Sequence, residues 1–289
     1  MDENYFLMKT KLKFSSRLKK EIFKGYLLIY YSIEVKLLKF FLFFFRKKIN
    51  DKKNKISLLC PSKNRSAKFK RLCNSLIKNT DSPTRVELLL CFDLIENEIH
   101  NYEIQISLLE NKGFVVKKYF KNLNSHAKRN NFLADQSEGE IIFPVNDDLI
   151  ILTSKWDNII DKEFSKNNSS NPLCVWIKCD RKYKNLDYSA FPVINTAWYN
   201  RLGYIVPEYF KFWYLDWWIC EVSRLSKHYF LSNVSIHQFH AETYHNEKDS
   251  VYMQNATSEN LEHDYNMWLK TRNYRIKDSL KIKSKIKLL

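Results

Sequence analysis

The chain has 289 residues, of which 45% are hydrophobic and 15% aromatic, so it can bury a large core and is not a disordered protein. It has only four glycines and neither GxGxxG nor GxxxxGK[ST], which excludes the common glycine-rich phosphate loops. Its six cysteines form no CxxC pair, which excludes zinc knuckles and indicates a reducing compartment. The net charge of +16 sits in two flanks, because residues 1–55 carry 15 Lys and Arg against 5 Asp and Glu, residues 270–289 carry 8 against 1, and residues 56–269 are almost neutral.

The first 55 residues are predicted to form a basic, aromatic-rich amphipathic helical region. Residues 26–45 have the length of a membrane span, but Glu34, Lys36 and Lys39 lie near the middle, and their cost outweighs the gain from the apolar residues. On a helix the polar residues fall along one stripe, so we expect this segment to lie in a membrane interface rather than to cross the membrane. The alternative is a helix that packs on the globular domain.

Strand and helix patterns alternate from residue 56 onwards. Apolar runs typical of buried strands occupy residues 56–60, 85–93, 113–120 and 139–145. Apolar residues recur at helical spacing in residues 66–78, 96–111 and 125–137. This order predicts βαβ crossovers and a mostly parallel sheet flanked by helices, an α/β fold.

Polar residues follow each predicted strand. They are PSKNRS (61–66), Asp93, KNLNSHAKRNN (121–131) and Asn146-Asp147-Asp148. Ligands of such sheets bind beyond the carboxyl ends of the strands, so we expect these groups to converge on one edge. Adjacent carboxylates suit a hard divalent cation such as Mg²⁺ or Mn²⁺, whereas the alternative is that Asn-Asp-Asp only makes a turn and caps the next helix.

The ordered set ISLLCPSKNRS, LLLCFD, NSHAKRNN and EIIFPVNDD resembles the nucleotide-sugar-binding half of family 2-type glycosyltransferases with the Rossmann-like GT-A fold. The resemblance covers about 100 residues, and its specificity lies in the order of the motifs rather than in any one of them. It implies that residues 56–150 bind a nucleotide-sugar donor, with UDP as the expected nucleotide, and that residues 151–269 bind the acceptor.

The resemblance also implies roles for single residues of the donor half. Pro61, Ser62 and Arg65 would line the nucleoside pocket, and Asp93 would contact the base or ribose. Each has a structural alternative, since Arg65 can be a solvated charge at a helix start and Asp93 a turn former at a strand end.

Two further groups complete the implied donor site. Arg129 and Asn130 would approach the ribose or diphosphate, unless Arg129 belongs to an exposed helical face. Asp148 would bind the metal. The first Asp of the family's D-x-D motif is Asn146 here, so its ribose or metal contact is weakened or passes to Asp147, and the usual acidic run after the second strand is reduced to Asp93.

An aromatic-rich stretch, residues 188–225, resembles the acceptor region of the same enzymes. Aromatic rings pack on the C–H faces of sugars, and we expect Trp213, Tyr214 and Trp217 to contact the acceptor while most other rings join the core. Asp216, at the start of a helix, is the candidate general base, with helix capping as its alternative role. Glu221 is the weaker choice of base.

Three histidines follow a strand-like run after this helix. GT-A enzymes often use such a histidine as a further metal ligand or phosphate contact, and His240 is the first candidate, followed by His237 and His245. Lys248 and Asp249 would suit a loop that closes over a diphosphate.

The C-terminal flank, residues 270–289, repeats the basic amphipathic theme. Ile276, Leu280 and Ile286 or Leu289 are spaced for one face of a helix, and the alternative is a frayed, solvated tail. With the N-terminal flank, it favours peripheral attachment to the cytoplasmic face of a membrane.

These expectations combine into a metal-dependent, inverting glycosyltransferase that moves a sugar to a saccharide or glycolipid acceptor in surface polysaccharide or glycan synthesis. One alternative is a catalytically silent GT-A-like partner subunit, which the replacement by Asn146 keeps open. The other is a nucleic-acid-binding protein that uses its basic flanks, which is disfavoured because the neutral middle lacks an RNP-like or zinc motif.

Overall fold

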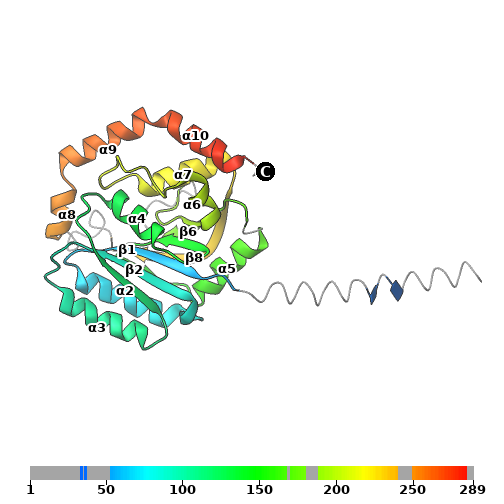
Figure 1. Ribbon diagram of the computed structural model, residues 1–289, viewed down its shortest axis with the longest axis horizontal. Coiled ribbons are helices and arrows are strands. Elements are labelled where there is room, and N and C mark those ends of the chain that lie inside the picture. The colour runs from blue at the N-terminus through cyan, green and yellow to red at the C-terminus, as the bar shows by residue number, and fades with distance from the viewer. Residues whose placement is uncertain are drawn as a thin grey trace, which may run out of the picture. The chain divides into compact units, whose positions relative to one another are not determined.

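A computed structural model describes residues 33–34, 36–37, 53–167, 170–179, 188–239 and 249–284 (Figure 1). The chain divides into two compact units, Met1–Lys53 and Asn54–Leu289. In the first unit, residues 33–34 and 36–37 are helical and exposed, and the rest of the predicted interfacial helix lies outside the described residues. Among the described helices, none combines the length and the apolar character needed to cross a bilayer.

The predicted parallel strands are confirmed as one half of the sheet. They are β1 (Ile56–Pro61), β2 (Val86–Phe92), β3 (Val115–Phe120) and β4 (Ile141–Pro144), in the spatial order β3-β2-β1-β4. Every pair among them is parallel, and Leu58 on β1 stands between Leu88 and Phe143 on its two neighbours. β1 and β2 are buried along their whole length, which is why they read as continuous apolar runs.

The other half of the sheet has a topology that the sequence analysis did not predict. Its strands are β5 (Leu149–Ile151), β6 (Cys174–Cys179), β7 (Val193–Asn195) and β8 (Tyr229–Gln238). They continue the sheet as β4-β7-β6-β8-β5, with antiparallel pairs except for the parallel pair β6–β8. The sheet is therefore mixed, and its parallel half carries the edge at which the predicted polar residues gather.

Helices cover both faces of the sheet (Figure 1). The helices α2 (Ser66–Asn79), α3 (Ile99–Glu110) and α5 (Trp156–Lys166) pack on one face. The other face is covered by α4 (His126–Asp135), α6 (Thr196–Leu202) and α7 (Leu215–Ser226). A short 3₁₀ turn, η1 (Pro83–Arg85), leads into β2. Phe69, Leu72, Cys73 and Leu76 recur at helical spacing, and all four are fully buried. This apolar side explains why α2 packs on the sheet.

The C-terminal helices are part of the domain. They are α8 (Ser250–Asn255), α9 (Ser258–Lys270) and α10 (Arg272–Lys283), and α9 and α10 run along the domain edge outside α6 and α7 (Figure 1). The predicted basic helix near the C-terminus is thus present, but it packs through Arg275, Asp278 and Ile282, which are buried. The predicted apolar face, Ile276 and Leu280, points outward, with 40% and 61% exposure.

Candidate active site

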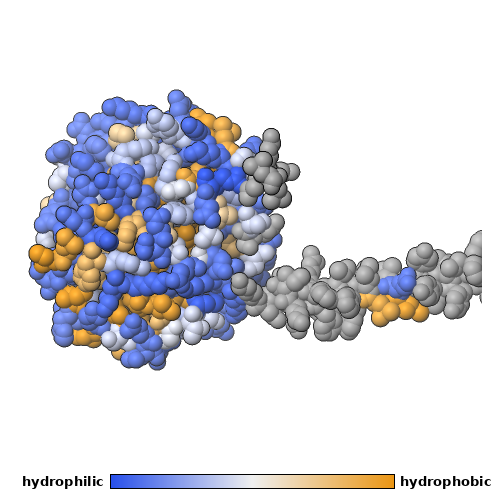
Figure 2. Space-filling model, viewed as in Figure 1, coloured by the Kyte–Doolittle hydropathy of each residue, from blue (hydrophilic) through white to orange (hydrophobic). Residues whose placement is uncertain are grey.

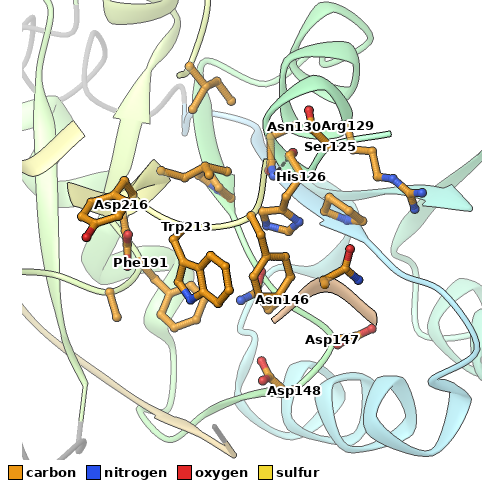
Figure 3. A pocket seen from close by; sticks show the side chains of 18 of the residues that line it. Ser125, His126, Arg129, Asn130, Asn146, Asp147, Asp148, Phe191, Trp213 and Asp216 are labelled. Atoms are coloured by element: carbon orange, nitrogen blue, oxygen red, sulfur yellow. Dashed lines mark hydrogen bonds between the residues drawn. The ribbon is translucent and has the colours of Figure 1, made fainter. Parts of the chain in front are cut away.

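A cavity of about 920 Å³ opens at the carboxyl edge of the parallel strands. It is lined by the loops that follow β1, β2, β3 and β4, and on the opposite side by α7, α8 and the start of α9. Most of the predicted site residues within the described ranges line it: Pro61, Ser62, Arg65, Asp93, Arg129, Asn130, Asn146, Asp147, Asp148, Trp213, Tyr214, Asp216 and Trp217. His237, the second histidine candidate, and Asp249 are described but are not among the lining residues. His240 lies outside the described residues. Figure 3 shows Asn146, Asp147 and Asp148 on one side of the cavity and Trp213 and Asp216 on the other.

Asp147 is held by protein groups at the base of this cavity. Its Oδ2 accepts a hydrogen bond of 2.7 Å from the Ser62 hydroxyl, which also lies 2.6 Å from the Tyr102 hydroxyl. The Tyr102 oxygen in turn accepts the Arg65 backbone N–H at 2.9 Å. Burial raises the pKa of Asp147, although the Arg65 charge and the Ser62 hydrogen bond oppose that rise. With 2% exposure, this carboxylate fixes the loop after β1 rather than facing solvent.

Arg65 lies between two carboxylates. Its guanidinium is 3.5 Å from Asp147 and 2.8 Å from Asp249, and Lys68 Nζ is 2.7 Å from Asp249. Asp249 also caps α8 by accepting the Tyr252 N–H at 2.7 Å. Burial opposes the ionisation of Asp249, but the hydrogen bonds from Arg65 and Lys68 hold its pKa below the usual range. The start of α8 is therefore tied to the start of α2 across the cavity.

Asp93 is flanked by two cations. Lys63 Nζ lies 2.8 Å from one carboxylate oxygen, and Arg129 forms an ion pair with the other. Burial would raise the pKa of Asp93, but the contacts with Lys63 and Arg129 outweigh it and lower that pKa. Arg129 also donates to the Leu123 carbonyl at 3.0 Å, so its guanidinium is fixed at the mouth of the donor half.

His126, which the sequence analysis did not single out, belongs to this side of the cavity. It is the first residue of α4, after the N-cap Ser125, and its ring is hydrogen-bonded to the Asn146 side chain (Figure 3). Burial, with the nearby charges of Arg129 and Arg65, lowers the pKa of His126 to about 4, so the ring is neutral at neutral pH. The one sequence feature that could have pointed to His126 is its place in the polar run after β3.

Asn130 lines the cavity and has a buried acceptor atom without a partner among the described residues. Its Nδ2 donates to the His126 carbonyl at 3.0 Å, whereas its Oδ1 is buried and has no hydrogen-bond partner within the described part of the chain. An unsatisfied buried carbonyl oxygen is costly, so such an atom suits a donor group on a bound ligand.

Asp148 faces β8 rather than the Asp147 network. The Gln238 amide donates to both of its carboxylate oxygens, at 3.1 and 3.2 Å. The Gln238 Oε1 is buried and has no hydrogen-bond partner among the described residues. Within the same residues, no cluster of three or more His, Cys, Asp or Glu side chains forms a ready-made metal cage. One carboxylate and one spare amide oxygen are nevertheless oxygen donors of the kind that Mg²⁺ and Mn²⁺ prefer.

The opposite wall carries Asp216 in the first turn of α7. Its Oδ1 accepts the Trp217 backbone N–H at 2.9 Å, which orients the carboxylate. Tyr214, the residue before α7, has a positive φ of 67°, and this bend separates the helix from the preceding loop. The expected helix-start position of Asp216 is thus confirmed, and it lies in the cavity beside Trp213 (Figure 3).

The loop before α7 is held by a buried carboxylate from α9. Asp264 is fully buried and accepts the backbone N–H groups of Lys211, Phe212 and Trp213 at 2.9, 2.8 and 2.9 Å. The Lys211 carbonyl accepts the His126 N–H at 2.9 Å, so the same loop also contacts the start of α4. Sequence reasoning missed Asp264 because its partners lie about 50 residues earlier in the chain.

The aromatic residues divide between core and cavity. Trp198 and Trp218 are buried in the core, as expected for most of the aromatic rings. Trp217 is 48% exposed and lies 4.7 Å from Tyr188, centroid to centroid. Tyr214 stacks on Trp268 of α9 at 5.3 Å, so one face of this ring is already covered by protein.

No protein-family model matches the chain, and no curated protein matches it in sequence. Solved structures do match. GalNAc-T7 with UDP, GalNAc and Mn²⁺ has a TM-score of 0.50 at 12% identity, covering 65% of this chain and 44% of its own. The mannosyltransferase PcManGT from Pyrobaculum calidifontis with GDP-Man and Mn²⁺ has a TM-score of 0.50 at 10% identity, covering 81% of this chain and 75% of its own. The chain has the GT-A fold.

A third match is S. aureus TarS 1–349 in complex with UDP, with a TM-score of 0.48 and 19% identity over 63% of this chain. The chain spans 57% of that structure's length. The GT-A fold explains why the cavity lies where it does, because this fold places its ligand site at the carboxyl edge of the parallel strands. At these identities the matches establish the arrangement of the chain, and the chemistry has to be argued from the residues themselves.

Proposed function

We propose that the protein is a metal-dependent glycosyltransferase that moves a sugar from a nucleoside-diphosphate-sugar, with UDP as the expected nucleotide, to a saccharide or glycolipid acceptor. The observation that carries this proposal is that one cavity has two unlike walls. One wall holds cations and amides around Asp148, and the other holds Asp216 among aromatic rings. The solved GT-A structures that support it contain UDP or GDP-Man together with Mn²⁺.

The donor wall has the groups that a nucleoside diphosphate requires. Arg65 and Arg129 line the cavity as the cationic members of ion pairs, and a diphosphate would compete with the paired carboxylates for their N–H groups. The Asn130 oxygen is available to accept a hydrogen bond from a ribose hydroxyl. Ser62 and Asp93 line the same wall. The first family carboxylate is replaced by the neutral Asn146–His126 pair, so this wall bears less negative charge next to the diphosphate than an intact D-x-D motif would.

Asp148 is the group that would hold a divalent metal, and the spare oxygen of Gln238 beside it fits the same cation. A bound Mg²⁺ or Mn²⁺ supplies charge neutralisation to a departing diphosphate. With one carboxylate from the described residues, much of the coordination shell would come from phosphate oxygens, which is the usual way proteins bind Mg²⁺. His240 stays a proposed additional ligand.

On the acceptor wall, Asp216 would accept the proton of an acceptor hydroxyl as that oxygen attacks the anomeric carbon of the donor sugar. The bond from this carbon to the diphosphate breaks on the opposite side, so the proposed reaction inverts the anomeric configuration. Trp213 and Trp217 would pack on the acceptor sugar, and Tyr214 contributes the edge that Trp268 leaves uncovered. Synthesis of a surface polysaccharide or glycan is the proposed context.

The test is calorimetric titration of UDP, GDP, CDP and dTDP into the full chain with and without Mn²⁺. We expect metal-dependent binding of one nucleotide, which Asp148→Ala abolishes and Glu110→Ala, an exposed carboxylate on α3, leaves intact. If none of the nucleotides binds in either condition, the glycosyltransferase proposal is wrong.

Asp216→Asn separates catalysis from binding. This variant should bind the nucleotide normally, but its transfer of sugar from the matching nucleotide-sugar should fall about a hundredfold to ten-thousandfold. Nucleotide binding without any transfer or donor hydrolysis by the unmodified protein would instead support a catalytically silent partner subunit.

A further inference from the structure

A continuous apolar stripe runs along the outer side of α9 and α10. It consists of Leu261, Tyr265, Leu269, Ile276 and Leu280, which are 40–61% exposed. Leu261, Tyr265 and Leu269 follow at four-residue spacing on α9, and Ile276 and Leu280 do so on α10, so each set lies on one side of its own helix. Leu261 also touches the mouth of the cavity. Core-facing helices normally bury such a stripe, whereas here the packed side carries Asp264, Arg275 and Asp278.

The charges beside the stripe on α10 are of one sign. Arg272, Lys277 and Lys283 are exposed, and Lys281 is 42% exposed at its side chain. The acid within α10, Asp278, is buried against the domain, where it contacts Tyr204. Figure 2 shows hydrophobic surface among hydrophilic side chains in the region of α10. On α9 the exposed charges are Glu259, Glu262 and Lys270, so the cationic border belongs to the α10 part of the stripe. This part is complementary to a lipid surface whose headgroups are anionic and whose interior is apolar.

We propose that the stripe on α9 and α10 docks on an anionic lipid bilayer, with its apolar side chains at the level of the acyl boundary and its lysines among the headgroups. Tyr265 and Tyr274 are 50% and 59% exposed. Tyrosine is a residue that favours the membrane–water interface. The docked surface is part of the folded domain, so it acts as a preformed binding face and needs no ordering on contact.

The stripe is connected to the cavity through the body of α9. Trp268, on the inner side of this helix, stacks on Tyr214 and contacts the Trp217 ring edge to face. Docking of α9 would therefore hold the acceptor wall close to the lipid headgroups, where an acceptor carried on a lipid is within reach. This last consequence rests on the proposed function, whereas binding of the stripe to lipid does not.

The experiment places a fluorescent reporter in the stripe of the full chain. In a Cys179→Ser background the five other cysteines are buried, so Leu280→Cys can be labelled selectively with a polarity-sensitive dye. The matched control is Leu108→Cys, which is 46% exposed on α3, on the other face of the sheet. We expect vesicles of phosphatidylcholine with phosphatidylglycerol to shift the emission of the Leu280→Cys label to the blue, and to leave the Leu108→Cys label unchanged.

Binding strength is measured by co-sedimentation with the same vesicles. Replacing Ile276 and Leu280 by Glu should weaken the partition of the protein by about tenfold or more, because two large apolar side chains are withdrawn from the interface. Lys277→Gln and Lys283→Gln should each weaken it about fivefold on anionic vesicles, whereas Lys112→Gln, in the turn after α3, should not.

Several outcomes would overturn the proposal. The stripe is not the docking surface if the protein sediments with vesicles while the Leu280→Cys label stays in a polar environment, which would assign binding to residues 1–52. Equal binding to pure phosphatidylcholine would exclude the role of the lysines. A blue shift that grows with protein concentration in the absence of vesicles would show that a second copy of the chain covers the stripe.

Discussion

A substitution of Asp264 tests whether this carboxylate holds the loop before α7 at the acceptor wall of the cavity. Its carboxylate accepts three consecutive backbone N–H groups, from Lys211, Phe212 and Trp213, and it is fully buried. Asp264→Asn keeps the shape of the side chain but replaces one accepting oxygen by an NH₂ group. In the better orientation the remaining oxygen serves Phe212 and Trp213. The NH₂ group then faces the Lys211 N–H and the His263 Nδ1, which lies 2.9 Å from the oxygen that is replaced.

The cost follows from these contacts. One hydrogen bond is lost and a buried donor is left unpaired, which costs about 1–3 kcal/mol, and the two surviving bonds lose their charge assistance at roughly 0.5–1 kcal/mol each. We therefore expect a loss of about 3 kcal/mol in the free energy of unfolding. For a domain of this size that corresponds to a fall of about 6–12 °C in Tm, measured by thermal unfolding.

The same substitution should separate the two walls of the cavity. The released loop carries Trp213 and leads into Asp216, so acceptor-dependent transfer should fall about tenfold to a hundredfold. Nucleotide binding at temperatures where the variant is folded should not change, and Glu262→Gln, exposed on the same helix, is the matched control. A variant with unchanged Tm and unchanged transfer would refute the view that Asp264 holds this loop.

The remaining predictions concern pH. Burial opposes the ionisation of Glu87, but hydrogen bonds from Ser57, Lys55 and Lys117 lower its pKa, so its contribution to stability is present above about pH 4.5 and is lost as the pH falls further. Glu87→Gln should lower the free energy of unfolding by about 2–4 kcal/mol at neutral pH. It should also weaken the dependence of that free energy on pH below about pH 4.5, as measured by urea unfolding across pH. Because burial lowers the pKa of His126 from 6.5 to about 4, protonation favours the unfolded chain, and stability should fall as the pH drops through this window. His126→Gln should remove that part of the loss, and an unchanged pH profile would contradict a buried neutral ring.

The parallel half of the fold could be predicted from the sequence because its signals are local. Strands such as Ile56–Pro61 and Val86–Phe92 are short apolar runs, and α2 has apolar residues at helical spacing. Once strands and helices alternate, the rule that ligands bind beyond the carboxyl ends directs attention to Asp93 and to residues 146–148. These positions do line one cavity.

What each of those residues contacts could not be predicted. Asp147 pairs with Ser62 across 85 positions, and Asp249 pairs with Arg65 across 184, and neither separation leaves a periodic signal. The sequence analysis assigned the metal to Asp148 and a nucleotide contact to Asp147 by resemblance alone. It could not predict that Asp147 is enclosed by the Ser62–Tyr102 network and that Asp148 faces Gln238.

In the second half of the sheet and in the C-terminal helices, too, local pattern could be predicted and tertiary contacts could not. β5 and β7 have only three residues each, too few for a pattern, and their places are set by antiparallel pairing with β8, β4 and β6. The sequence by itself determined the spacing of Ile276 and Leu280, which favoured a helix with an apolar face over a frayed tail, and the helix is confirmed as α10. Only the tertiary structure decided that this face points outward. The buried Arg275 and Asp278 find partners in Glu221 and Tyr204, and a helix packs on the side where its polar groups are satisfied.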